Sequence, residues 1–352
     1  MTSRKGNRRG TAGRTARILL AVLAAMALVI AGCGTDEDDG TVTMARANWD
    51  SGYMQAAIYA QLIGELGYEV SDPADNTRDP NGFYPALASG QFDLWVNGWF
   101  PLHDIYLEGE RVTGQSVDLP IEPVGFQVRS GALQGYMIDK ATADARGITS
   151  MSQLADASVA RIFDQDGDGL ADLIGCNDGW GCQNVIDSHI GELGWGPNVE
   201  QISGDYNSLV AGVRDRVASG EPVLFYAWTP NWTYQVLTPG TDVVWLESPA
   251  LDDEEASTEV QGLRGCASDP CNLGWAVSSI RAVGNEDFLD DNSDIRRLLE
   301  VVSIPLSDIA AQNAAMAGAD LGYSEAQIKA DAADWIEANR DTVDRWLATA
   351  RG

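Results

Sequence analysis

Strand-like apolar runs that alternate with helical patterns constrain the fold of this chain more than any other feature. Residues 41–48 have the composition of a strand, residues 52–66 show a helical repeat that ends before a glycine, and FDLWVNGW, residues 92–99, is a second strand. The pattern resumes with a helix over 205–219 and the apolar run PVLFYAW, residues 222–228. Because strands and helices alternate with short connections, the sequence predicts an α/β fold whose sheets are mainly parallel and flanked by helices.

The remaining elements are predicted in the same way. Helices are expected over residues 85–90, 141–146, 149–154, 183–193, 294–303, 306–317 and 324–349, and a strand over 274–280. Residues 248–271 are acidic and irregular, which predicts a loop. The last helix is expected to contribute to the core with one face, formed by Ile328, Ala332, Trp335 and Ile336.

The N-terminus has the features of a secretory signal. Six basic residues precede thirteen apolar residues, 18–30, and this apolar run is shorter than a membrane-spanning helix. The ending VIAGC resembles the lipobox of bacterial lipoproteins, in which the cysteine becomes the lipidated first residue. We therefore predict a signal peptide over residues 1–32, a lipidated Cys33 and a flexible acidic tether over 33–40. The alternative is an ordinary secretion signal in which the cysteine is incidental.

The charge of the chain excludes some partners. Its formal net charge is −29, and removal of residues 1–32 takes away six basic and no acidic residues, which leaves −35. Such an acidic protein is not expected to bind nucleic acid, and its self-repulsion favours a soluble monomer. Because salt screens that repulsion, the composition suits a salty or osmotically variable environment.

Export also makes disulfide bonds expected. If Cys33 is lipidated, four cysteines remain, and their short spacings favour the pairs Cys176–Cys182 and Cys266–Cys271. Four cysteines nevertheless permit three connectivities. The chain has two histidines, so a zinc site built on imidazole is not expected.

The stretch GCNDGWGCQ, residues 175–183, is the first candidate for a binding site. A bridge between its two cysteines would close a small glycine-containing loop with Trp180 near the tip. A helix is predicted to begin directly behind this loop, and the free N–H groups of Gly181 and Cys182 would attract an anion. The alternative is a disulfide that only stabilises the fold, with a tryptophan at the surface.

Two further tryptophan-containing stretches favour a binding site. GWFPLHD, residues 98–104, and YAWTPNW, residues 226–232, both follow predicted parallel strands, where α/β proteins bind ligands. Tryptophan faces attract cations that lack hydrogen-bond donors, such as trimethylammonium. Either stretch alone is better explained by core packing, but three stretches placed in this way predict an aromatic site. Trp49, just past the first strand, can line the same cleft, although we expect it to be buried.

The acidic loop DQDGDGLAD, residues 164–172, is a separate candidate for a metal site. Asp164, Asp166, Asp168 and Asp172 fit positions 1, 3, 5 and 9 of an EF-hand loop, but position 12 is Gly175 instead of the usual glutamate. Two interpretations remain open: a structural calcium site, or a turn stabilised by aspartate and glycine that binds no metal.

Several stretches together resemble one protein family. They are GYMIDK (135–140), FDQDGDGLADLIGCNDGWGC (163–182), FYAWTP (225–230), PLHD (101–104) and DIAAQNAAM (308–316). These stretches resemble the glycine betaine/proline betaine-binding proteins of osmoprotectant ABC importers, and the similarity extends over most of residues 41–349. Gly98 and Phe100 beside the first tryptophan, and the CASDPC stretch (266–271), depart from the family pattern.

The resemblance implies a fold and a site. The fold would be a two-lobed periplasmic-binding-protein-like fold of type II, with lobe I over residues 41–140 and 273–352, lobe II over 141–272, and the ligand in the cleft between them. In that family, three tryptophans surround the quaternary ammonium, and a histidine with two backbone amides holds the carboxylate. The residues carried over by motif are Trp99, Trp180 and Trp228 for the ammonium and His103, Gly181 and Cys182 for the carboxylate.

The resemblance also implies partners. The expected protein is a lipid-anchored receptor on the outer surface of the cell membrane, which closes over its ligand by a hinge near residues 135–140 and 273–279 and delivers it to a permease with a cytoplasmic ATPase. No cofactor is required and no catalysis is expected.

One alternative is a choline or carnitine receptor. Others are a secreted thiol enzyme, which the absence of C-x-x-C and G-x-S-x-G motifs disfavours, and an acidic calcium-binding surface protein.

Overall fold

The computed structural model describes residues 40–107, 119–251, 258–318 and 322–352. The predicted signal peptide over 1–32, Cys33 and the tether up to residue 39 lie outside these residues. Contacts divide the chain into Met1–Thr41 and Val42–Gly352, and the following description concerns the second unit. Within the described ranges, every helix is too short or too polar to cross a bilayer.

A mixed sheet of nine strands forms the centre of the fold. Its order is β4-β2-β5-β13-β6-β9-β7-β8, with β10 also paired to β6. The strands are β2 (Met44–Ala47), β4 (Thr77–Arg78), β5 (Leu94–Phe100), β6 (Ile121–Asp139), β7 (Ala171–Ile174), β8 (Val199–Ile202), β9 (Leu224–Thr229), β10 (Val243–Leu246) and β13 (Ser278–Asn285). Short strands outside this sheet are β1 (Thr41–Val42), β3 (Glu69–Val70), β11 (Glu259–Val260) and β12 (Cys271–Asn272).

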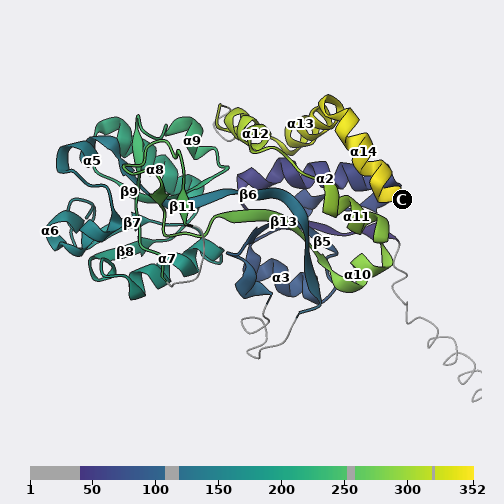
Figure 1. Cartoon of the computed structure of the whole chain (residues 1–352), viewed down its shortest axis with the longest axis horizontal. Coiled ribbons are helices and arrows are strands. Elements are labelled where there is room, and N and C mark those ends of the chain that lie inside the picture. The colour runs from purple at the N-terminus through teal and green to yellow at the C-terminus, as the bar shows by residue number, and fades with distance from the viewer. Residues whose placement is uncertain (1–39, 108–118, 252–257, 319–321) are drawn as a thin grey trace, which may run out of the picture. The chain divides into compact units, whose positions relative to one another are not determined.

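The long strand β6 connects two groups of strands. Residues 121–132 of β6 pair with β13, which in turn pairs with β5, whereas residues 133–139 pair with β9 and β10. Figure 1 shows β6 and β13 running between these groups. We call β2, β4 and β5 with their helices the first lobe, and β7, β8, β9 and β10 with theirs the second lobe. The predicted residue boundaries of the lobes and the position of the hinge stay predictions.

The predicted parallel pairing describes the outer strands of each lobe. Strand β2 is parallel to β4 and β5, and β7 is parallel to β8 and β9. The two crossing strands instead pair antiparallel with each other and with their neighbours, because β6 runs from the first lobe into the second and β13 returns.

Helices pack beside the strands in both lobes (Figure 1). They are α2 (Tyr53–Leu66), α3 (Pro80–Ala88), α5 (Lys140–Arg146), α6 (Ala157–Ala160), α7 (Gly181–Glu192), α8 (Tyr206–Ser219), α9 (Thr233–Val236), α10 (Glu286–Asp291), α11 (Ser293–Val301), α12 (Leu306–Gly318), α13 (Glu325–Ala338) and α14 (Arg340–Arg351). Short 3-10 turns include η1 (Asp50–Gly52) and η4 (Met151–Ala155). Helix α2 ends where predicted, because Gly67 adopts the left-handed conformation with a φ of 110°.

Some predicted boundaries are wrong, and the capping residues explain two of them. Helix α3 begins at Pro80 and not at residue 85, because the side chain of Asp79 accepts a hydrogen bond from the Gly82 amide and proline is favoured in the first turn. The predicted helix over 324–349 is two helices, α13 and α14, separated by Asn339. The strand predicted over 274–280 begins only at Ser278.

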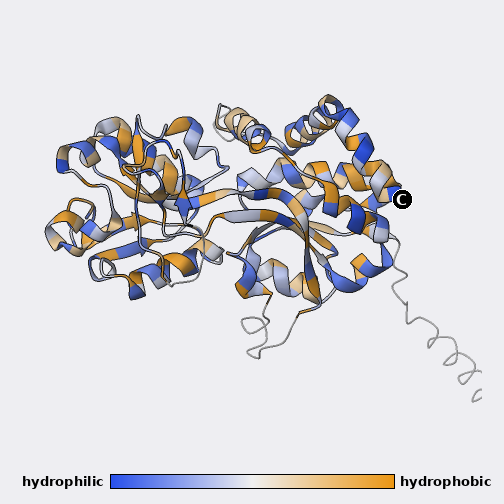
Figure 2. Cartoon of the chain, viewed as in Figure 1, coloured by the Kyte–Doolittle hydropathy of each residue, from blue (hydrophilic) through white to orange (hydrophobic). Residues whose placement is uncertain are grey.

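Apolar side chains of the strands form the core with the inner faces of the helices. Figure 2 shows many hydrophobic residues in the strands and alternating hydrophobic and hydrophilic residues along the helices. On α13, the predicted core residues Ile328, Ala332 and Ile336 are buried, whereas Trp335 is only partly buried. The strands are therefore held firmly enough to position the loops that follow them.

Candidate ligand-binding site

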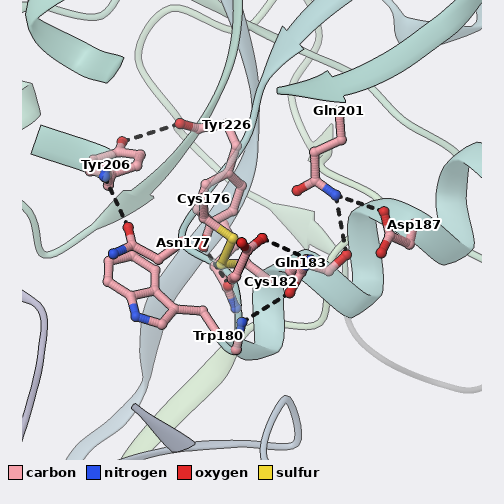
Figure 3. Close-up of a disulfide and its surroundings, with 12 residues drawn as sticks. Cys176, Asn177, Trp180, Cys182, Gln183, Asp187, Gln201, Tyr206 and Tyr226 are labelled. Carbon is pink, nitrogen blue, oxygen red and sulfur yellow. Dashed lines mark hydrogen bonds between the residues drawn. A yellow bond between two sulfur atoms is a disulfide. The ribbon is translucent and has the colours of Figure 1, made fainter. Parts of the chain in front are cut away.

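A disulfide-closed loop connects β7 to α7 in the second lobe (Figure 3). Cys176 and Cys182 are bonded, with their Cα atoms 6.6 Å apart, and Gly179 has a φ of +85°, which favours glycine. The Gly179 amide donates to Oε1 of Gln183 over 2.9 Å, so the first turn of α7 supports the loop. Trp180 occupies the N-cap position of α7, with its side chain fixed beside the helix start.

A pocket at this loop is lined by residues of both lobes. It encloses about 310 Å³, part of it open to solvent. The lining residues are Trp49, Trp99, Leu102, His103, Gln134, Trp180, Gly181, Cys182, Tyr226 and Trp228. The structure thus brings together all six ligand-binding residues that the sequence predicted.

The walls of the pocket are aromatic. The Trp180 ring packs edge to face against Trp49, with centroids 5.4 Å apart, and against Trp228, with centroids 5.5 Å apart. The indole N–H groups of Trp49 and Trp99 both donate to Oδ1 of Asn97, over 2.8 and 3.0 Å. Because these hydrogen bonds and ring contacts hold the indoles in place, the pocket in this arrangement of the lobes suits an apolar or cationic group.

The start of α7 forms one end of the pocket. Gly181 and Cys182 are the first two residues of this twelve-residue helix, so their N–H groups precede the first intrahelical acceptor. A Cβ atom at position 181 would come within 2.9 Å of Cγ of Leu102, another lining residue. The absence of a side chain therefore lets the helix start approach the first lobe closely, and its N–H groups can bind an anion.

His103 is buried at the same pocket as a neutral imidazole. Its Nδ1 accepts a hydrogen bond from the Trp99 amide over 3.2 Å and lies 2.9 Å from the Tyr84 hydroxyl. An amide can only donate, so the ring proton is on Nε2, which is left as the donor. Burial lowers the pKa of His103 to about 3, so the ring stays uncharged at neutral pH.

Four lining residues were not assigned to the site from the sequence. Trp49 is buried as expected, but it also lines the pocket, and its place just after β2 corresponds to that of Trp228 near the end of β9. Gln134 of β6 lies opposite Trp228 of β9, and the Tyr226 hydroxyl donates to Oε1 of Gln134 over 2.7 Å. Tyr226 belongs to the YAWTPNW stretch that was selected from the sequence, whereas only the pairing of β6 with β9 reveals Gln134. Leu102 is the fourth.

The other candidate residues lie outside this pocket. Cys266 and Cys271 form a second disulfide, with their Cα atoms 6.0 Å apart. All four cysteines in the described residues are therefore paired, which leaves no thiol there for a thiol enzyme.

The acidic loop brings its carboxylates together. Oxygens of Asp164, Asp166 and Asp172 lie within 4.8 Å of one another, and so do those of Asp166, Asp168 and Glu200. Burial and the neighbouring aspartates raise the pKa values of the Asp172 and Glu200 carboxyls. Amides of the loop also donate to these carboxylates, as Gly167 does to Asp164. The donor set is of the type that calcium prefers, and calcium binding stays a prediction.

Comparisons with known proteins show the family of this chain. The family described as the substrate-binding domain of the ABC-type glycine betaine transport system matches residues 40–338. The glycine betaine-binding periplasmic protein OusX of Dickeya dadantii (strain 3937) is 36% identical over 299 residues, which cover 84% of this chain and 86% of that protein. The glycine betaine/proline betaine-binding periplasmic protein of Escherichia coli (strain K12) has the same identity and coverage.

Solved structures share the fold at low sequence identity. A choline-binding protein of an ABC transporter in complex with choline has a TM-score of 0.65 at 16% identity, with 89% of this chain and 93% of that chain covered. Lactococcal OpuAC in its closed conformation with glycine betaine has a TM-score of 0.63 at 16% identity, with coverages of 88% and 100%. These likenesses establish the two-lobed periplasmic-binding-protein fold.

Proposed function

Because the chain belongs to the family of substrate-binding domains of ABC-type glycine betaine transport systems, whose members are binding proteins and not enzymes, we propose that it captures glycine betaine or proline betaine for an ABC importer. The observation that carries the proposal is the pocket itself, in which tryptophan walls face the free N–H groups at the start of α7. A betaine has the two complementary poles, a methylated cation and a carboxylate.

The tryptophans are suited to the cationic pole. A quaternary ammonium cannot donate hydrogen bonds, so a carboxylate in the pocket would gain little specificity, whereas indole faces attract both its charge and its methyl groups. Each desolvated cation–π contact contributes up to about 2 kcal/mol. Trp99, Trp180 and Trp228, with a charge-assisted site for the other pole, are enough for the roughly −8 kcal/mol of micromolar binding.

The helix start and His103 are suited to the carboxylate. The amides of Gly181 and Cys182 combine two donors with the positive end of the helix dipole. His103 adds a third donor, since its Nδ1 is already occupied and its proton is on Nε2. Choline and other ligands without a carboxylate would leave these donors unused, which favours a betaine over choline.

The proposal includes an anchored receptor outside the cytoplasm. The relatives from Dickeya and Escherichia are periplasmic proteins by name. The VIAGC sequence before the acidic tether supports a lipid anchor on Cys33, which would keep the receptor next to a permease that works with a cytoplasmic ATPase. The formal charge of −35 that remains after removal of residues 1–32 supports a monomer that does not bind nucleic acid.

Titration of the intrinsic tryptophan fluorescence tests the ligand. Glycine betaine and proline betaine are expected to give saturable changes, with choline and proline much weaker. Trp180→Ala removes about 2 kcal/mol and should weaken betaine binding by about 30-fold or more. Trp346→Ala is the matched control, because this partly buried tryptophan packs on Trp335 far along the chain from the pocket walls. Unchanged betaine binding in Trp180→Ala would contradict the assignment of the pocket.

A further inference from the structure

Two side-chain hydrogen bonds connect the lobes directly behind the aromatic pocket. The indole N–H of Trp180 donates to Oδ1 of Asn48 over 2.7 Å. The side-chain amide of Asn207 donates to Oδ2 of Asp50 over 2.9 Å. Asn48 and Asp50 follow β2 of the first lobe, whereas Trp180 caps α7 and Asn207 belongs to α8 of the second lobe. We call these two hydrogen bonds the interlobe clasp.

The clasp and the aromatic pocket lie on opposite sides of the tryptophans. Asn48, Asp50 and Asn207 are absent from the lining of the aromatic pocket. They line instead a second, polar pocket of about 230 Å³, together with three aromatic residues that also line the first pocket: Trp49, Trp180 and Trp228. The indoles thus lie between the two pockets, and Trp180 takes part in both the aromatic pocket and the clasp.

Asn48 and Asn207 are each held in place by a residue of their own lobe. The backbone amide of Asn48 donates to the Arg78 carbonyl over 3.0 Å. Oδ1 of Asn207 accepts from the Trp232 indole over 3.2 Å, which fixes the side-chain amide so that its NH₂ group faces Asp50. Separation of the lobes would break the clasp and leave these bonds within each lobe intact.

The carboxylate of Asp50 is buried at the interlobe clasp and depends on hydrogen-bond donors around it. Burial raises the pKa of Asp50, and hydrogen bonds from Asn207, Tyr53 and Trp232 oppose the rise. A carboxylate that loses water on closure needs such donors, because an unsatisfied buried charge is costly. Asn207 of α8 and Trp232, which follows β9, both come from the second lobe, so these two donors reach Asp50 only where the lobes are in contact.

The loop tip shows how closely the lobes approach. A Cβ atom at Gly179 would lie 3.3 Å from Cγ of Asp79 and from Nδ2 of Asn81, both at the start of α3 in the first lobe. The loop that carries Trp180 therefore rests on the first lobe at its tip and bonds to it through the indole.

We propose that the interlobe clasp stabilises the closed arrangement of the lobes and holds Trp180 in the pocket, so that Asp50 and Asn207 set the ligand affinity without touching the ligand. They are positioning residues. The apparent dissociation constant rises in proportion as the closed, binding-competent fraction falls. The proposal rests on the proposed function, since its readout uses glycine betaine.

A charge exchange tests the clasp. Asn207→Asp places a second carboxylate opposite Asp50 and is expected to weaken glycine betaine binding by about tenfold or more, since a hydrogen bond to a charged group is worth more than one decade in affinity. The double variant Asp50→Asn/Asn207→Asp exchanges donor and acceptor, and it should bind within about threefold of wild type. Fluorescence titration, dissociation rates and small-angle scattering with and without glycine betaine provide the measurements.

Each outcome of these measurements either supports or overturns the clasp. A positioning role predicts faster ligand release and a larger ligand-dependent change in the radius of gyration for Asn207→Asp, with an unaltered melting temperature of the ligand-free protein. A single variant that binds like wild type, or a double variant no better than the single one, overturns the clasp. Failure of the wild-type protein to bind glycine betaine or proline betaine contradicts the proposed function instead.

Discussion

Two buried histidines should make this protein less stable in mild acid. His103 and His189 are 2% and 1% exposed, and Nδ1 of each lies within hydrogen-bond distance of a tyrosine hydroxyl, from Tyr84 and Tyr136 respectively. Burial lowers the pKa of His103 to about 3 and that of His189 to about 4. Both rings are therefore neutral in the folded protein at every pH at which it is normally studied.

The size of the effect follows from the unfolded chain. There the histidine pKa is about 6.5, so below this pH the unfolded state binds protons that the folded state does not. The free energy of unfolding therefore has its full value above pH 6.5. It decreases as the pH falls from 6.5 toward the folded-state pKa, because protonation of the histidines stabilises the unfolded chain. At pH 5, which is still above both folded-state values, each histidine has lost about 2 kcal/mol of the free energy of unfolding, and the two together about 4 kcal/mol.

Urea unfolding of the ligand-free protein at pH 8 and pH 5 measures this loss. His189→Gln is the informative variant, because residue 189 lies outside the tryptophan pocket. The variant should lose about 2 kcal/mol less than wild type between the two pH values. Its own unfolding free energy at pH 8 is the control, since that value reports the packing cost of the substitution alone. Equal losses in variant and wild type would refute the argument.

Two further predictions concern the acidic loop and the N-terminus. After treatment with a chelator, calcium at about 1 mM should raise the melting temperature of wild type but not of Asp164→Ala, with magnesium as the control ion, and equilibrium dialysis that finds no bound calcium would rule the site out. Expression of the full chain in a bacterial host should place it in the membrane fraction, and Cys33→Ser should release it as an exported protein. A wild-type protein recovered free of membranes would contradict the lipid anchor.

Much of the fold could be predicted from local patterns. The helix at Tyr53–Leu66 and its glycine end, the helix at Tyr206–Ser219 and the buried strand that contains Trp228 all follow from periodicity and capping residues. The antiparallel crossing of β6 and β13 could not be predicted in this way, because pairing between strands separated by more than a hundred residues leaves no local signal. The break at Asn339 was missed because the apolar spacing continues across it.

Some residues of the candidate site could be predicted from the sequence and others could not, for a similar physical reason. Trp99, Trp180 and Trp228 lie near the ends of strands or at a helix start, where the α/β architecture itself concentrates ligand contacts. Gln134 lies within a crossing strand and reaches the pocket only because β6 pairs with β9, in the register that sets it opposite Trp228. Asn48 and Asp50 are two polar residues among many, and only the approach of the second lobe gives them partners.

The proposed site for a zwitterionic betaine has no charged side chain among its lining residues. In the proposed mode of binding, indole faces attract the cation, helix amides and a neutral histidine attract the anion, and both sets of groups are buried. Surface charges behave differently, because salt screens exposed carboxylates strongly and buried dipoles much less. In a chain with a formal net charge of −29, rising ionic strength therefore relieves the repulsion across the surface while the pocket keeps its interactions with the ligand. A receptor for compatible solutes needs this combination, since it must bind its ligand when the external salt concentration is high.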